Sequence, residues 1–262
     1  MKKLFASTLT AALLLTTNAT AYDFGSKPSK ISSQFIAPTQ SLDSVKKKLT
    51  DNGFKILATT TIIDGHDVIT ITNEELQATN SYMATINVSV NSSDVHVQNP
   101  SYLGAAFIGD KYKYGQFKAT VNALEKALGS LKDSKQKTDF DDLEDYNFMM
   151  GMPKVDDTIT VKEGKDLASK LKDVAYKLTL PNGNVLVGHK LSKKTNEFLK
   201  TVGEENNAQI LPYESMVLKG EVQILDPKFY LALSLPKLSM GQFMEIASIP
   251  DDIEQEITKA YK

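Results

Sequence analysis

The feature that most constrains the fold is a stretch that occurs twice. Residues 95–107 read VHVQNPSYLGAAF, and residues 222–234 read VQILDPKFYLALS. Each has β-branched and apolar residues, then Asn or Asp followed by proline, then an apolar run that contains an aromatic residue. Proline cannot continue a central strand, but it suits the first turn of a helix. Each stretch therefore predicts a strand that ends before proline and a helix that begins at Pro100 or Pro227.

The segments around these two stretches occur in the same order. In each half, the pattern predicts a strand, a helix, a strand hairpin, a short helix, a second hairpin, the proline-started helix and a further helix. The first unit fits residues 39–130 and the second fits residues 158–262. We therefore expect an α+β fold of two pseudo-repeated units, each an antiparallel sheet with helices packed on one face. The pattern leaves open whether the two sheets join.

Local signals place single elements. Ser41 suits the N-cap of a helix whose apolar residues recur at helical spacing, and Gly53 follows its end. Strict alternation predicts a half-buried strand over residues 82–90. In the second unit, Pro212 lies inside the predicted strand 208–220, which favours an edge position or a bulge for that strand.

The first 21 residues have the pattern of a cleavable signal peptide. Two lysines precede an uncharged, mostly apolar run over residues 4–15, and Ala19 and Ala21 fit an A-x-A cleavage site. The run is shorter than the roughly 20 apolar residues of a membrane span. We therefore expect an exported, periplasmic protein without a membrane span after cleavage. Residues 22–38, rich in Ser, Lys and Pro, are expected to be a flexible tail, with QFIA (residues 34–37) as a candidate strand.

The composition excludes several classes of site. The chain of 262 residues has no cysteine, which rules out disulfides, a thiol nucleophile and a cysteine-based zinc site. All 30 basic residues are lysine, so the bidentate arginine clamp for phosphate is missing. The net charge of −2 gives no basis for binding nucleic acid.

Residues 131–157 break the pattern and are expected to link the two units, with a short helix near 140–147. Five carboxylates lie close together in this linker, at Asp139, Asp141, Asp142, Glu144 and Asp145. Oxygen ligands suit calcium, but the spacing of a calcium-binding loop is missing. Acidic residues at a helix N-terminus need no ion, which favours that simpler interpretation.

The linker also contains the hexapeptide FMMGMP, residues 148–153. Thioether sulfurs are ligands for soft metals such as Cu(I), so copper handling is one alternative function. The simpler interpretation is that the methionines fill an irregular gap between the two units. Tyr146, Met149, Met150 and Met152 are candidate ligand-binding residues on either view.

Only three histidines occur, at positions 66, 96 and 189. They form no zinc-binding motif, and no nucleophile elbow is present, so the sequence predicts no metal site. A hydrolase with dispersed catalytic residues stays an alternative function. It would place His96 or His189 within hydrogen-bond distance of a serine or a carboxylate.

Two candidate residues lie inside the repeated stretch. His96 and Asn99 in the first copy correspond to Gln223 and Asp226 in the second, which makes them candidate ligand-binding residues that differ between the units. His96 alternates with valines and is therefore expected to point away from the core.

Three motifs resemble the domain-of-unknown-function family 302, in the tandem form of exported epsilonproteobacterial members. They are SVKKKLTDNGFKIL (residues 44–57), VHVQNPSYLGAAF and DYNFMMGMP (residues 145–153). The resemblance covers residues 40–130, and it reaches the second half only through the internal repeat. It implies a TBP-like α+β fold and no established activity.

The sequence favours a binding module over an enzyme. A groove between sheet and helices, or between the two units, is the natural place for a small apolar ligand or a protein partner. No cofactor and no oligomeric state is predicted.

Overall fold

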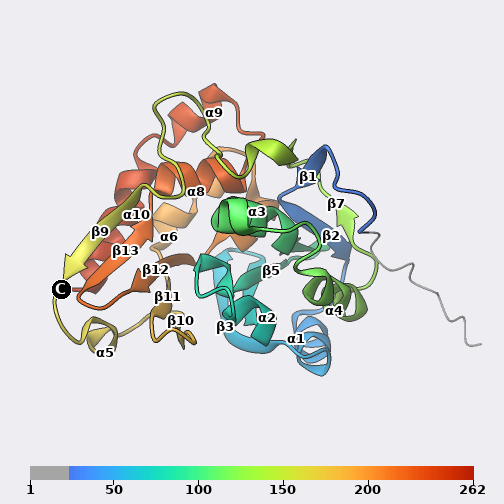
Figure 1. Ribbon diagram of the computed structural model, residues 1–262, viewed down its shortest axis with the longest axis horizontal. Helices are drawn as coiled ribbons and strands as arrows, with labels where there is room; N and C mark the ends of the chain where they lie inside the picture. The colour runs from blue at the N-terminus through green and yellow to red at the C-terminus, as the bar shows by residue number, and fades with distance from the viewer. Residues whose placement is uncertain (1–23) are drawn as a thin grey trace, which may run out of the picture.

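The computed structural model describes residues 24–262, so the predicted signal peptide lies outside the described residues. Across these residues, the strands form three antiparallel sheets with helices around and between them, which confirms the α+β class (Figure 1). Each helix within the same range is too short or too polar to cross a membrane.

The larger sheet has the strand order β3-β4-β5-β6-β2-β7. Its strands are β2 (Gln34–Pro38), β3 (Lys55–Ile63), β4 (His66–Thr72), β5 (Ile86–Val90), β6 (Asp94–Gln98) and β7 (Lys132–Asp133). Every residue of β5 is buried, although its sequence alternates between apolar and polar residues. Both faces of this sheet are therefore covered, as in a central layer.

Helices of the first half follow the predicted order. They are α1 (Leu42–Asp51), α2 (Glu74–Gln77), η1 (Tyr82–Ala84), α3 (Pro100–Ile108), η2 (Gly109–Lys111) and α4 (Lys118–Leu128). The Ser41 hydroxyl accepts a hydrogen bond from the backbone N–H of Ser44 at 3.3 Å, which caps α1. Val45 and Leu49 are fully buried, so the predicted face of this helix is confirmed.

The second sheet has the order β10-β11-β12-β13-β9. Its strands are β9 (Thr158–Glu163), β10 (Tyr176–Thr179), β11 (Val185–His189), β12 (Tyr213–Val217) and β13 (Glu221–Leu225). The helices of this half are α5 (Leu167–Lys170), α6 (Lys193–Asn196), α7 (Phe198–Thr201), η4 (Glu205–Ile210), α8 (Pro227–Ser234), α9 (Met240–Glu245) and α10 (Ile249–Ala260).

The two sheets share a strand order. In each, the two hairpins lie side by side, and the strand before the first helix of the half (β2 or β9) pairs with the last strand of the second hairpin. In both halves, the repeated stretch contains the last strand of the second hairpin and the helix that follows it. The Asn99 Oδ1 caps α3 by accepting from the Ser101 N–H at 3.0 Å, and the Asp226 Oδ1 caps α8 by accepting from the Lys228 N–H at 2.8 Å. This order is an observed property, whereas a TBP-like fold and an internal repeat stay predictions.

The sheets do not join; instead, each half covers the other. The η4 segment lies on the face formed by β4, β5 and β6 of the first half. In the reverse direction, the Tyr82 hydroxyl of η1 donates to the carbonyl of Gln223 on β13 at 3.0 Å. Phe229 and Leu233 of the second half belong to the first core. The larger sheet is therefore covered on both faces, by helices of its own half and by segments of the other half.

Parts of the predicted tail and of the predicted linker form regular secondary structure. Residues 30–38 form β1 (Lys30–Ser32) and β2, and β1 pairs with β8 (Lys137–Asp139) in the two-stranded sheet. The predicted flexible tail was therefore wrong over β1, whereas β2 contains the candidate strand at residues 34–37. In the linker, η3 (Phe140–Asp142) replaces the predicted helix near 140–147. Phe140 and Tyr146 are buried in the first core, so the linker contributes to folding.

Two further predictions about single strands fail. The predicted strand 82–90 begins only at Ile86, since Ser81 caps η1 and Tyr82 reaches across to the second sheet. The predicted edge strand around Pro212 is the central strand β12, with neighbours on both sides. Pro212 precedes the first residue of β12, so no hydrogen bond of the ladder is lost.

Candidate functional site

Two of the predicted ligand-binding residues have structural roles. The side chain of Asn99 caps α3 and also donates to the carbonyl of Ser32 at 2.8 Å. Tyr146 is buried, its hydroxyl donates to the carbonyl of Ala232 at 2.9 Å, and its ring meets Phe229 edge to face. Both residues therefore hold the first core together, and Tyr146 also lines the open pocket described below.

The methionines of the linker are exposed instead of filling a gap between the halves. The side chain of Met150 is 97% exposed and that of Met149 is 47% exposed. Met152 is half-buried and closes a turn by donating its N–H to the carbonyl of Met149 at 3.0 Å. Gly151 adopts a φ of 85° in this turn, a conformation that favours glycine.

A second methionine pair lies next to this turn. Met244 on α9 is 65% exposed and Met240 is 46% exposed, and their four-residue spacing puts them on one side of the helix. The rings of Phe148 and Phe243 stack with centroids 5.0 Å apart, which fixes α9 against the turn. We call Met149, Met150, Met240 and Met244 the methionine surface.

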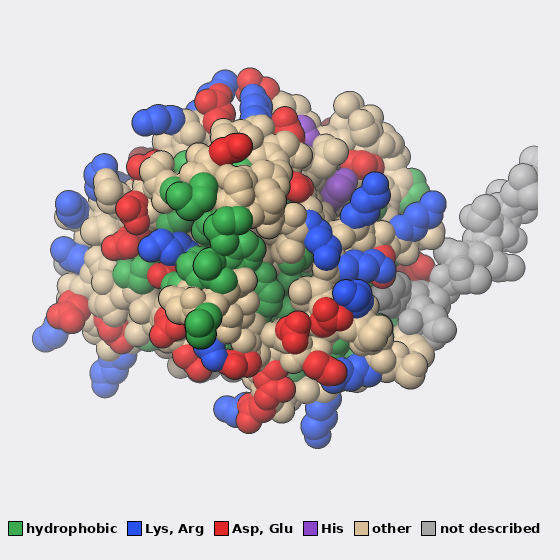
Figure 2. Space-filling model, turned by 90° about the horizontal axis from the view of Figure 1, so that it is seen from above, with side chains coloured by type: hydrophobic (Ala, Val, Ile, Leu, Met, Phe, Trp, Pro, Cys, Tyr) green, Lys and Arg blue, Asp and Glu red, His purple; other side chains and the backbone are tan. Residues whose placement is uncertain are grey.

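The methionine surface lies on the face of the molecule that carries α9. Figure 2 views this face and shows hydrophobic side chains gathered on it, with acidic side chains along its margin. In Figure 1, α9 and the turn after η3 project together at the top of the molecule. The capping box of Ser239 and Gln242 stabilises α9 at its N-terminus.

An open pocket of about 500 Å³ adjoins this surface. It is lined by Asp141, Asp142, Asp145 and Phe148, among others, and Phe148 is the ring that stacks on α9. The five carboxylates of the linker form an acidic cluster whose charge is reduced by three exposed ion pairs. The pairs are Lys27 with Asp141, Lys30 with Asp139, and Lys154 with Asp145. The cluster has five carboxylates, so it keeps an acidic excess.

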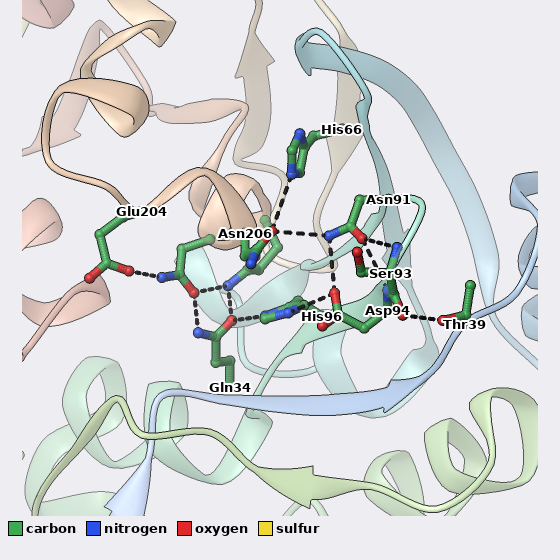
Figure 3. Close-up of polar contacts among 11 residues, drawn as sticks. Gln34, Thr39, His66, Asn91, Ser93, Asp94, His96, Glu204 and Asn206 are labelled. Atoms are coloured by element: carbon green, nitrogen blue, oxygen red, sulfur yellow. Dashed lines mark hydrogen bonds and ion pairs between the residues drawn. The ribbon is translucent and has the colours of Figure 1, made fainter.

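His96 belongs to a polar seam between the halves (Figure 3). Its Nδ1 lies 3.1 Å from the Gln34 Oε1, and its Nε2 lies 3.0 Å from the Asp94 Oδ1. The Gln34 side chain also bonds Asn207 and Gln209 of η4, all of them buried. His96 points away from the side of β6 that carries Val95 and Val97, as expected, but η4 covers that face of the sheet and buries the ring.

The buried centre of the seam lies between two less buried ends. At one end, the His66 Nε2 lies 3.4 Å from the Asn206 Oδ1. At the other end, the half-buried Glu204 accepts hydrogen bonds from Asn207 and from the Gln136 Nε2. Burial lowers the pKa of His96 and raises the pKa of Glu204, so the seam favours uncharged groups. We interpret it as a set of amide contacts that holds η4 on the first sheet.

His189 lies within hydrogen-bond distance of a serine, as the hydrolase alternative requires, but this serine is not accessible to a substrate. The His189 Nε2 lies 2.7 Å from the Ser215 Oγ, and this Oγ lies 2.7 Å from the Tyr261 hydroxyl. Ser215 is fully buried in β12, so a substrate cannot reach its hydroxyl without opening the core. Burial lowers the pKa of His189 to about 4, which keeps the ring neutral at physiological pH.

No known family model, curated protein or solved structure matches this chain.

The resemblance to family 302 therefore stays a prediction. Among residues 24–262, no group of three His, Asp or Glu side chains is arranged to hold a metal ion.

Sequence reasoning missed the α9 half of the methionine surface. The signal was available in SMGQFMEIA (residues 239–247), where Met240 and Met244 are separated by one helical turn. Nothing in the sequence pairs that helix with the turn 149–152, because their contact depends on the packing of Phe148 against Phe243.

Proposed function

We propose that this protein is an exported binding module whose methionine surface holds a cationic, amphipathic segment of a partner protein. The observation that carries the proposal is the set of four exposed methionines beside an acidic pocket. Large exposed hydrophobic side chains are costly unless they bind something, and grouped ones are typical of interaction sites.

The residue type supports a protein partner. Methionine is unbranched and polarizable, so a methionine surface can adapt to different apolar side chains, as in proteins that bind amphipathic helices. The stacked pair Phe148 and Phe243 gives this surface a rigid base. An apolar helix face of the partner would cover the methionines and displace water from them.

The acidic residues of the adjoining pocket are the reason for proposing a positively charged partner segment. Asp141, Asp142 and Asp145 line that pocket beside Phe148. Lysine or arginine residues at the edge of a bound helix would face these carboxylates, and lysine stems would extend the apolar contact. A negatively charged partner would be repelled at the same place.

A small apolar ligand has less support. The aromatic-lined cavity between Tyr82, Tyr213 and Tyr230 has a volume of about 10 Å³. This is room for about one water molecule. A ligand-sized cavity would need some hundreds of Å³.

The first prediction is that a helical Leu/Lys peptide of about 18 residues binds the purified protein. Replacing Met149, Met150 and Met244 with glutamine should weaken binding at least tenfold, because the apolar contact is lost. Fluorescence anisotropy of the labelled peptide measures the affinity. Replacing Asp141, Asp142 and Asp145 with asparagine should weaken peptide binding. The affinity of this variant should also change less with salt concentration than that of the wild type.

A Leu/Glu peptide of the same pattern is the matched control and should not bind. Equal binding of the two peptides, or unchanged affinity in the glutamine variant, would contradict the proposal. Binding of the protein to vesicles in place of the peptide would assign the surface to a membrane and would also overturn it.

Copper handling is a second candidate, favoured by one observation. A copper site at Met149–Met152 needs a further ligand nearby. Met240 and Met244 are candidates, because the stacking of Phe148 on Phe243 brings their helix next to the turn. Exposed thioethers without cysteine suit Cu(I) in an oxidising compartment. The periplasmic location is itself a proposal that rests on the pattern of residues 1–21.

Leucine substitutions separate the two functions. Replacing Met149, Met150, Met240 and Met244 with leucine keeps the apolar surface but removes the sulfurs. If the surface binds a peptide, this variant should keep peptide affinity within about threefold. If it binds copper, the wild type should remove Cu(I) from a bicinchoninate complex under anaerobic conditions and the leucine variant should not. No transfer to the wild type would eliminate the copper candidate.

A further inference from the structure

The methionine sulfurs of the described residues are divided between the surface and the interior. All four side chains of the methionine surface are exposed, and they are the only exposed large hydrophobic side chains among residues 24–262. Met83 is fully buried in the core of the first half. Met216 is also buried, in the apolar cluster that contains Tyr176. A reagent dissolved in water therefore reaches the sulfurs of the methionine surface and not those of the interior.

The composition concentrates the oxidation chemistry of this chain on the same surface. The chain has no cysteine and no tryptophan, and half of its eight methionines belong to the methionine surface. In the absence of cysteine, methionine is the sulfur side chain that a peroxide oxidises, and the product is the sulfoxide. The reaction follows exposure, so we expect it at the methionine surface first.

The chemical step at each exposed sulfur needs hydrogen peroxide and no other reactant. The thioether sulfur attacks one peroxide oxygen, so that an S–O bond forms and the O–O bond breaks. The proton of the transferred oxygen goes to the departing hydroxide, which leaves as water. The sulfur is oxidised by two electrons and the peroxide is reduced by two. A thiol-dependent methionine sulfoxide reductase reverses the change, with the oxygen leaving as water and the thiols forming a disulfide.

Oxidation changes the polarity of the methionine surface but leaves its support intact. A sulfoxide oxygen is a strong hydrogen-bond acceptor, and the apolar face of a bound helix offers it no donor. Covering the oxidised surface with such a helix is therefore unfavourable. The stacked rings of Phe148 and Phe243 hold α9 against the turn without any sulfur, and the buried Met83 and Met216 are shielded from the reagent. The fold is thus expected to persist while the surface becomes polar.

We propose that the methionine surface is a reversible modification site, at which peroxide oxidises the exposed sulfurs to sulfoxides and the oxidised surface releases the partner segment. This inference rests on the proposed function, because it is the bound segment that oxidation releases. It adds the condition under which binding ends, namely exposure to peroxide, and the reaction that restores binding, namely reduction by thiols through a reductase.

The modification itself is measured by limited treatment with hydrogen peroxide, tryptic digestion and mass spectrometry. The four methionines of the surface should be oxidised at least about fivefold faster than Met83 and Met216, which are the controls within the same molecule. A saturating amount of the Leu/Lys peptide should slow oxidation of the four severalfold, whereas the Leu/Glu peptide should not. Equal rates at exposed and buried methionines would overturn the site, because the protein would then have to open before it reacts.

The consequence for binding is measured by anisotropy of the labelled Leu/Lys peptide. The oxidised protein should bind it at least about tenfold more weakly. Two methionine sulfoxide reductases, one for each epimer, should restore the affinity to within about twofold of the untreated protein. The variant with leucine at all four positions of the methionine surface is the matched control, and its affinity should not change on the same treatment. Urea unfolding of the oxidised wild type should match that of the untreated protein.

The possible outcomes separate this inference from the proposed function. No binding of the Leu/Lys peptide by the untreated protein would contradict the proposed function and, with it, this inference. Binding that survives oxidation of all four methionines would overturn this inference alone. Loss of affinity in the peroxide-treated leucine variant would place the effect outside the exposed sulfurs, and unfolding of the oxidised wild type would attribute release to loss of the fold. Either result would also overturn the inference.

Discussion

Replacing Gly188 with alanine should destabilise the protein by about 2–5 kcal/mol. Gly188 of β11 lies opposite Tyr176 of β10, and the tyrosine ring covers the glycine. A Cβ at position 188 would overlap the ring, with Cδ1 at 2.7 Å and Cζ at 2.8 Å. Atoms at that separation repel strongly, so the ring or the strand would have to move.

The ring cannot move without a second loss. The Tyr176 hydroxyl donates to the Glu214 carboxylate of β12, which also accepts from the Thr85 hydroxyl of the first half. Displacing Tyr176 would leave Glu214 with one donor fewer, at a cost of about 1–3 kcal/mol on top of the strain. Urea unfolding of the variant measures the total.

Gly241→Ala provides the matched control for this substitution. Gly241 lies in α9, its nearest neighbour to an added Cβ is the Ser239 hydroxyl at 3.8 Å, and its backbone does not require glycine. Alanine there should be neutral or stabilising by about 0.5–1 kcal/mol. In a Tyr176→Leu background, Gly188→Ala should cost much less, because the ring is gone. A stability of Gly188→Ala within about 0.5 kcal/mol of the wild type would show that the sheet adapts freely.

The second large effect is expected from Glu214→Gln, and it should depend on pH. Burial raises the pKa of Glu214 from 4.5 to about 7, although its hydrogen bonds from Thr85 and Tyr176 act in the opposite direction. The folded protein therefore holds this proton more tightly than the unfolded chain does. As the pH rises from about 4.5 to 7, the wild type loses stability at this site, and the loss persists above pH 7.

Glutamine keeps an acceptor oxygen for Tyr176 and Thr85 but has no proton to lose. The difference in unfolding free energy, variant minus wild type, should therefore increase between pH 5 and pH 8 by about 2–3 kcal/mol. Comparing the two proteins at each pH cancels the titration of the histidines. Glu163→Gln, at an exposed position of β9, is the control and should show no such increase. A difference that stays constant with pH would contradict the expected burial of the Glu214 charge.

Local elements could be predicted from the sequence because neighbouring residues determine them. The α1 helix begins after Ser41 and buries Val45 and Leu49, as its spacing indicates. The joints at Pro100 and Pro227 follow from the fixed φ of proline and the capping side chain before it. These features need no information about distant parts of the chain.

The candidate site could be predicted only in part. The unusual content of FMMGMP indicated Met149 and Met150, but the sequence favoured their burial, whereas both are exposed. For His96, alternation in β6 placed the ring on the side away from the valines, but it did not predict that η4 of the second half covers that side and encloses the ring in amide contacts. In both cases the missing information was the packing of one half on the other.

By itself, the sequence determined the α+β class, the strand and helix order of each half and the proline joints, because local spacing and backbone restriction act within a few residues. Only the tertiary structure decided that each half covers a sheet of the other and that α9 packs against the turn 149–152. Those contacts join residues far apart in the chain, and they depend on how whole layers pack. The strands and helices around Pro100 and Pro227 therefore follow from local sequence, whereas the methionine surface depends on the packing of α9.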